Sequence, residues 1–348
     1  MEWGEVIVSK TTKSINLALQ GGGSHGALAW GIIDKLLEDD RLKFDSVSST
    51  SAGTMNAAVL AYGLATGGND GAREELHNFW RMISEAGALY SPMKMTPMEE
   101  MLGVKMENSM AYNCMDLLSK ILSPYQLNPL NFNPLRDVLE KCIDFDKIKT
   151  SKKLKLFISA TNVKTGKIKV FENKDISIDT VLASACLPFM FQSVQVENDF
   201  YWDGGYMGNP AIFPLIYNSD CPDILIIHLN PIFRDQVPDS AAEILNRMNE
   251  ISFNSSLMRE MRAISFVSKM LDNRWIKDEY RKNMKRLFMH AIRADVNMQL
   301  FSVASKLNTD WDFLTQLHEE GRRQGEAWLK QHFGQVGKET TIDMDEYL

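Results

Sequence analysis

The chain has 348 residues, of which 45% are hydrophobic and 24% charged, and its formal net charge is −7 at pH 7. This composition is that of an ordinary globular protein and excludes an intrinsically disordered chain. The four cysteines lack the paired spacing of a metal site, so we expect reduced thiols of an intracellular protein, with no disulfide, metal or cofactor. They are Cys114, Cys142, Cys186 and Cys221.

The amino terminus lacks the features of a secretory signal. Glu2 and Glu5 stand where a signal would carry basic residues, and no apolar stretch is long enough to cross a bilayer. We therefore expect a cytoplasmic protein, either free or bound peripherally to a membrane. Export by a machine that needs no signal peptide stays open.

Apolar runs alternate with helical patterns along the first two thirds of the chain. The expected strands cover residues 14–20, 44–49, 154–163, 194–201 and 223–229, and the expected helices cover residues 25–37, 52–64 and 177–186. This alternation predicts an α/β fold with a mostly parallel central sheet. Active sites in such sheets lie at the carboxyl ends of the strands.

A glycine-rich loop follows the first expected strand. Residues 21–26 read Gly-Gly-Gly-Ser-His-Gly and run directly into a helix. Three consecutive glycines leave backbone N–H groups bare, and the positive end of the helix points the same way. The loop therefore predicts a site that can hold a developing oxyanion.

A serine stands at the turn between the second strand and an alanine-rich helix. Residues 49–53 read Ser-Thr-Ser-Ala-Gly, so small side chains lie two before and two after Ser51. A sharp strand-to-helix turn needs such small neighbours because its backbone is crowded. Ser51 is therefore a candidate nucleophile, although a serine at this position can also act as a simple helix N-cap.

An aspartate follows the aromatic run at residues 200–202. It belongs to the sequence Asp203-Gly204-Gly205, and the two glycines let its carboxylate approach another backbone closely.

Together these motifs, in this order, resemble those of the patatin-like phospholipase family. The resemblance covers about residues 14–230, and the segment Ala-Ser-Ala-Cys-Leu-Pro-Phe at residues 183–189 is similar to one that usually precedes the family's aspartate motif. It implies a three-layer α/β/α sandwich, plus a helical C-terminal region, and a serine acyl hydrolase that cleaves fatty-acyl esters of lipids.

The resemblance also assigns roles to single residues. It implies Ser51 as nucleophile, Asp203 as base, and an oxyanion hole at Gly21, Gly22 and Gly23. The supporting motif positions are His25, Gly26, Ser49, Gly53, Gly204 and Gly205. Two of them depart from the family pattern, because His25 replaces an Arg or Lys and Ser49 replaces a glycine.

A dyad of this kind requires Asp203 to take the proton of Ser51 directly or through a water. Burial beside Tyr201 and Trp202 would raise its proton affinity. The alternative is a triad through His228, which ends the strand at 223–229. Four further histidines lie among charged residues in helical patterns and are expected at the surface. They are His77, His290, His318 and His332.

The expected domain division is a catalytic domain at residues 1–235 and a helical extension at 236–348. A methionine-rich insertion at about residues 82–135 holds eight of the 20 methionines and several prolines. Such a segment is either ordinary helical core or a flexible cap over an acyl-chain site. Its methionines are Met82, Met93, Met95, Met98, Met101, Met106, Met110 and Met115.

A basic block interrupts the acidic chain at residues 259–293. It indicates either a solvated helix face or a surface that docks on anionic membrane lipid. No motif indicates nucleic-acid binding. A protein or small-molecule activator stays open.

Other functions remain as alternatives. The ester could belong to a phospholipid, a lysophospholipid, a non-phospholipid ester or a stored polyester, and a catalytically silent lipid-binding module would keep Ser51 only as a cap. The loop at 21–26 also spells the dinucleotide-binding pattern G-x-G-x-x-G. That pattern needs an acidic residue at the end of the second strand, whereas Asp45 opens this strand, so a dinucleotide-binding protein is the least favoured interpretation.

Overall fold

The computed structural model describes residues 12–91, 106–281, 284–293, 301 and 304–348. Within these residues, eight strands form one mixed sheet. The strands are β1 (Lys13–Leu19), β2 (Leu42–Ser49), β3 (Lys155–Asn162), β4 (Ile168–Glu172), β5 (Val194–Val196), β6 (Asp199–Asp203), β7 (Asp223–His228) and β8 (Phe288–Arg293). Their order is β5-β6-β3-β2-β1-β7-β8, and β4 pairs with β3 beside this path.

The parallel part of the sheet runs from β3 through β2, β1 and β7 to β8, whereas β4, β5 and β6 pair antiparallel. The described helices are α1 (Gly26–Asp39), α2 (Ala52–Tyr90), α4 (Met110–Ile121), α5 (Pro124–Leu127), α6 (Pro134–Cys142), α7 (Phe145–Thr150), α8 (Ile178–Ser184), α9 (Phe213–Asn218), α10 (Ala241–Asp272), α11 (Asp278–Arg281) and α13 (Trp311–His332). None of the helices described is both long and apolar enough to span a membrane.

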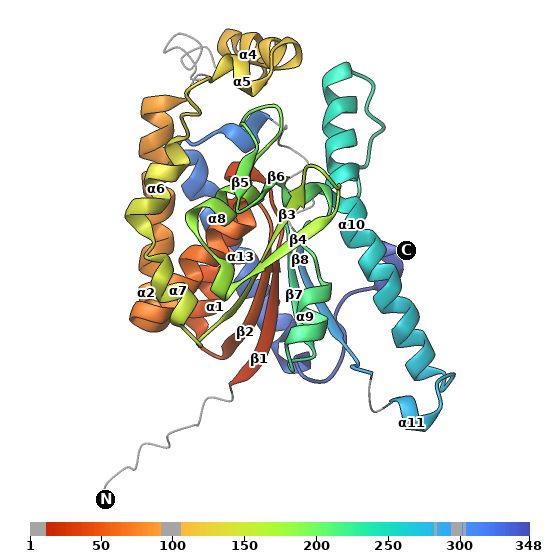
Figure 1. Ribbon diagram of the computed structural model, residues 1–348. Coiled ribbons are helices and arrows are strands. Elements are labelled where there is room, and N and C mark those ends of the chain that lie inside the picture. The colour runs from red at the N-terminus through yellow and green to blue at the C-terminus, as the bar shows by residue number, and fades with distance from the viewer. Residues whose placement is uncertain (1–11, 92–105, 282–283, 294–300, 302–303) are drawn as a thin grey trace, which may run out of the picture.

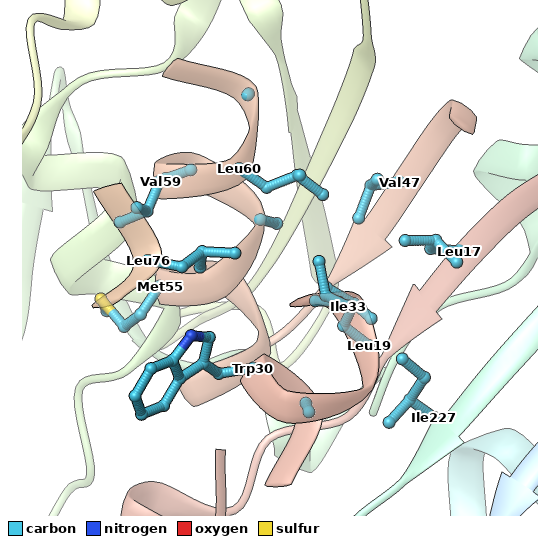
Figure 2. Close-up of a cluster of buried hydrophobic side chains, with 14 of the residues drawn as sticks. Leu17, Leu19, Trp30, Ile33, Val47, Met55, Val59, Leu60, Leu76 and Ile227 are labelled. Carbon is cyan, nitrogen blue, oxygen red and sulfur yellow. The ribbon is translucent and has the colours of Figure 1, made fainter. Parts of the chain in front are cut away.

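Alternating side chains of the central strands point into two separate cores. Leu17 and Leu19 of β1 pack with residues of α1, α2 and α13, whereas Ala18 packs with residues of α9 and α10. Figure 2 shows the first core, where Trp30 of α1 and Leu60 of α2 cover the sheet. A buried strand with apolar residues on both faces requires a helical layer on each side. The three-layer α/β/α sandwich is confirmed.

The C-terminal region is mostly helical but is more than an appendage. β8 pairs with β7 in parallel and forms one edge of the sheet, which corrects the expectation of an entirely helical chain after about residue 240. α13 packs on α1, and glycines allow the contact: a Cβ on Gly31 would collide with the carbonyl of His318, and one on Gly321 with the carbonyl of Leu28. The C-terminal region therefore completes both the sheet and one helical layer.

The insertion at residues 82–135 is only partly described. The long helix α2 runs on to Tyr90 with a kink at Gly68, and Met82 packs against the core. α4 has no buried residue, and its Met110 is 82% exposed. Figure 1 shows α4 and α5 beyond the carboxyl ends of β1 and β2. Four of the methionines behind the cap prediction, Met93, Met95, Met98 and Met101, lie outside the described residues.

Candidate active site

Ser51 occupies a strained turn between β2 and α2. Its backbone angles are φ 55° and ψ −125°, which for a residue with a side chain costs about 1–3 kcal/mol. The small neighbours allow the turn, because a Cβ on Gly21 would lie 2.6 Å from Cβ of Ser51, and one on Gly53 would collide with the carbonyl of Leu19. The Ser51 side chain makes no capping hydrogen bond to α2, so the simple N-cap interpretation has no support from its contacts.

A series of hydrogen-bonded hydroxyl groups stabilises this turn. The Ser51 amide donates to Oγ of Ser184 at 3.0 Å, Ser184 Oγ lies 2.9 Å from Oγ1 of Thr54, and Thr54 Oγ1 lies 3.3 Å from Oγ of Ser49. The hydroxyl of Ser49 thus has a partner where the family usually has a glycine. Ser184 comes from the motif at 183–189, and its contact with Ser51 could not be predicted from that motif.

Asp203 ends β6 and is fully buried. Its Oδ1 accepts a hydrogen bond from the Gly205 amide at 2.7 Å, while its Oδ2 is buried without a hydrogen-bond partner in the described structure. Burial raises the pKa of Asp203 to about 6, and the Gly205 amide, the nearby Ser51 hydroxyl and the charge of Lys306 act in the opposite direction. The carboxylate is therefore close to Ser51, ionised at neutral pH, and more basic than an ordinary aspartate.

The glycine loop at 21–23 is fixed by two asparagines. The Gly21 amide donates to Oδ1 of Asn209 at 2.7 Å, and the Gly21 carbonyl accepts from Nδ2 of Asn230 at 2.8 Å. Because the Gly21 amide is already engaged, an incoming oxyanion would meet the loop at Gly22 and Gly23. Gly23 has φ +58°, and a Cβ there would collide with the backbone of Lys306.

His25 follows in the short 3-10 helix η1 (Gly23–His25) and is 2% exposed. Its Nε2 lies 2.7 Å from Oγ of Ser305, and its ring centroid lies 5.7 Å from that of Phe301. Burial, together with the charge of Lys306, lowers the pKa of His25 well below its usual value. His25 is thus neutral at neutral pH and links the glycine loop to Ser305, whereas the family commonly has a cation at this position.

A cavity of about 360 Å³ opens onto these groups. Ser51, Gly22, Gly23 and Ser24 line one side of it, and most of the remaining wall is apolar. The apolar part consists of Ala52, Met55, Phe79, Trp80, Ile83, Leu135, Ala185, Leu187, Met190, Phe191, Phe253 and Leu307. Pockets of this size and character take ligands with a large apolar portion. The arrangement can therefore place an apolar ester beside a serine and a buried carboxylate.

Two buried histidines, His228 and His290, make their contacts away from this site. His228 is buried, and its Nε2 lies 2.8 Å from the Tyr347 hydroxyl; burial and the charge of Arg293 lower its pKa to about 3. Its described contacts do not include Ser51 or Asp203, so they give a triad no support. The expectation that His290 lies at the surface is wrong. His290 is buried, and its Nε2 lies 3.0 Å from Oδ1 of Asp223.

Part of the basic block is bonded to the rest of the fold. Arg286 pairs with Asp272 at 2.5 Å, Lys285 donates to the carbonyl of Ser219, and Arg293 pairs with Glu346. α11, within the block, lies at the end of the molecule opposite α4 and α5 (Figure 1). Lys282 lies outside the described residues.

No curated protein sequence matches the chain. Among solved structures, VipD from Legionella pneumophila is 14% identical, with a TM-score of 0.42, and the match covers 91% of this chain and 67% of VipD. ExoU of the Pseudomonas aeruginosa type III secretion system, solved in complex with SpcU, is 14% identical with a TM-score of 0.31. That match covers 92% of this chain and 54% of ExoU, so the chain spans about half the length of ExoU.

The family model for patatin-like phospholipase matches residues 17–216. This range contains the glycine loop, Ser51 and Asp203, and it makes up more than half of the chain. The chain therefore belongs to the patatin-like phospholipase family, a family of lipid acyl hydrolases.

Proposed function

We propose that this protein hydrolyses fatty-acyl esters of lipids with a Ser51–Asp203 dyad. The observation that carries the proposal is the placing of a strained, cavity-lining Ser51 beside a buried carboxylate whose Oδ2 has no hydrogen-bond partner in the described structure. A hydroxyl needs a base to become a nucleophile, and Asp203 is the group available beside it.

The reaction would proceed in two halves. In the first, Oγ of Ser51 attacks the ester carbonyl while its proton passes to Asp203, and the N–H groups at Gly22 and Gly23 receive the oxyanion. The tetrahedral intermediate collapses, the ester bond breaks, and Asp203 returns the proton to the leaving alkoxide. In the second half, Asp203 takes a proton from water as that water attacks the acyl-serine, and the proton returns to Ser51 when the fatty acid leaves.

The raised pKa of Asp203 suits both halves. With a pKa of about 6, the carboxylate is about nine-tenths ionised at pH 7 and so can accept a proton. A base with a pKa near the working pH also returns the proton readily to a leaving group.

The apolar cavity supports an acyl chain as the part of the substrate that is bound. We propose a lipase of the phospholipase A or lysophospholipase type, with esterases for non-phospholipid esters or stored polyesters as the nearest alternatives. A silent lipid-binding module would share the cavity but would turn nothing over. The hydrolysis assay described next separates these possibilities.

The test uses the purified full chain with a soluble chromogenic acyl ester and with vesicles of mixed phospholipid and neutral lipid, with products identified by mass spectrometry. We expect hydrolysis of both, and labelling of the protein by a fluorophosphonate. Ser51→Ala should abolish both, while Ser252→Ala, which changes an exposed serine on α10, should abolish neither. Wild-type protein that binds lipid without releasing fatty acid would leave the silent module as the function.

A further inference from the structure

One short segment from outside the family-matched range is fastened to the glycine loop. The 3-10 helix η5 (Ala304–Leu307) contributes Ser305, which lies 2.7 Å from His25, and Lys306, whose backbone occupies the space that a side chain on Gly23 would need. The loop and η5 therefore pack directly, with their backbones in contact at Gly23. The position of Lys306 relative to Ser51 is fixed by that packing.

The ammonium group of Lys306 is held toward the same loop. Its Nζ donates to Oδ1 of Asn230 at 2.8 Å, and Asn230 in turn donates to the carbonyl of Gly21 at 2.8 Å. A second, longer hydrogen bond runs to Oδ1 of Asn249 at 3.5 Å. Among the cavity-lining residues that the structure describes, Lys306 is the one with a cationic side chain.

Several charged groups determine the state of this lysine. Burial lowers its pKa to about 8, Glu250 and Asp203 act to raise it, and Arg234 acts to lower it. His25, the other titratable neighbour, has its own pKa lowered by Lys306. Lys306 is thus charged below about pH 8, and its charge reaches both the dyad and the glycine loop.

We propose that Lys306 supplies the positive charge that stabilises the oxyanion at Gly22 and Gly23. This inference rests on the proposed function. When Ser51 attacks, its proton neutralises Asp203 and the negative charge moves to the former carbonyl oxygen. The backbone of Lys306 packs against Gly23, while its ammonium group is held beside the loop by Asn230 and interacts with the charge of Asp203. Its interaction with the negative charge that arrives at the loop therefore strengthens in the transition state. His25, which is neutral, acts through Ser305 to hold η5 in place.

The test compares Lys306→Met with Lys306→Arg and with Lys174→Met, which removes an exposed lysine that does not line the cavity. Each variant is assayed on a neutral soluble ester and on phospholipid vesicles. We expect Lys306→Met to lower kcat on the order of a hundredfold on both substrates with little change in KM, since one oxyanion-stabilising group is lost. Lys306→Arg should keep much of the rate, and Lys174→Met all of it.

The pH profile gives a readout that a structural role would not change. Wild-type kcat/KM should rise with pH as Asp203 ionises near pH 6 and fall as Lys306 loses its proton near pH 8. In Lys306→Met the alkaline fall should disappear, and the acid limb should move to higher pH, because Lys306 lowers the pKa of Asp203. An alkaline limb that persists in Lys306→Met overturns the proposal.

Two other results would also overturn it. A loss confined to phospholipid would show that Lys306 binds an anionic headgroup, and an unchanged rate on both substrates would show no role in the reaction. If Lys306→Met has a clearly lower melting temperature than the wild type, the test uses the pH profile of Lys306→Arg instead. Its alkaline limb should move to higher pH. A wild-type protein that fails to hydrolyse esters or to react with fluorophosphonate refutes the proposed function itself.

Discussion

Two regions of the chain build the same cavity in different ways. The family-matched range brings Ser51, Asp203 and the glycine loop, each on a tight turn at the end of a strand. The region after it brings Phe253 from α10 and Lys306 from η5, which shape the opposite wall. The first region holds the candidate reacting groups, and the second contributes to the charge and shape of the cavity around them. Beside the cavity, the two regions are in contact at Gly23 and Lys306.

The first prediction tests whether the chemistry belongs to the matched region alone. Asp203→Asn keeps the shape of the side chain but cannot accept a proton, so turnover should fall on the order of a thousandfold. His228→Ala should cost far less, because His228 contacts Tyr347 instead of the dyad. Both are measured as kcat on a soluble ester. The reverse ranking would replace the dyad with a histidine-dependent mechanism.

The second prediction concerns the contact between the regions. Gly23→Ala places a Cβ against the carbonyl of Lys306 at a positive φ, so both loop and η5 must shift, and turnover should fall about a hundredfold, as for one lost oxyanion donor. Gly22→Ala is the comparison within the same loop, because its Cβ would meet Leu229 at 3.1 Å and not η5, and its φ of −177° is open to alanine. It should lose less turnover than Gly23→Ala. Equal losses in the two variants would mean that contact with η5 is irrelevant to turnover.

The candidate reacting groups could be named from the sequence because their signals are local. Glycines at 21–23, small residues around Ser51 and glycines after Asp203 report the crowding of single turns, which any reader of the chain can see. The α/β/α sandwich follows in the same way from strands and helices in alternation.

The wall of the cavity that the region after residue 216 contributes has no local signal in the sequence. Lys306 and Asn230 reach the glycine loop only through tertiary contacts, and Asn209 meets Gly21 across nearly two hundred residues of chain. β8 was missed because Arg286 before it and Arg293 at its end are typical of a solvated helix, whereas pairing with β7 decides its conformation. His290 was placed at the surface for the same reason.

The third prediction tests His25 as the link between the regions. Its buried ring has room for neither a longer side chain nor a permanent charge, so His25→Arg should lower the free energy of unfolding by about 3 kcal/mol or more. His25→Gln can still reach Ser305 and should keep most of the stability and activity. Denaturant unfolding and ester turnover measure the two effects. A stable, active His25→Arg variant would show that the ring does not act as a connector.

The last prediction has the smallest expected effect and leaves the cavity untouched. If the basic block docks on anionic lipid, its exposed members Arg262 and Lys277 are the ones to test, because Arg286 and Lys285 are bonded within the fold. Two such charges contribute about 2 kcal/mol, which is about thirtyfold in affinity, so reversing both to Glu should weaken binding to anionic vesicles by at least this factor at low salt.

The control for this change reverses Lys167 and Lys174, two exposed lysines outside the block, so that the net charge changes equally. Hydrolysis of a soluble ester should be the same in both variants, since Ser51 and Asp203 are unchanged. A similar loss of vesicle binding in both would indicate that net charge alone drives association. Unchanged binding in both would make the basic block a solvated face.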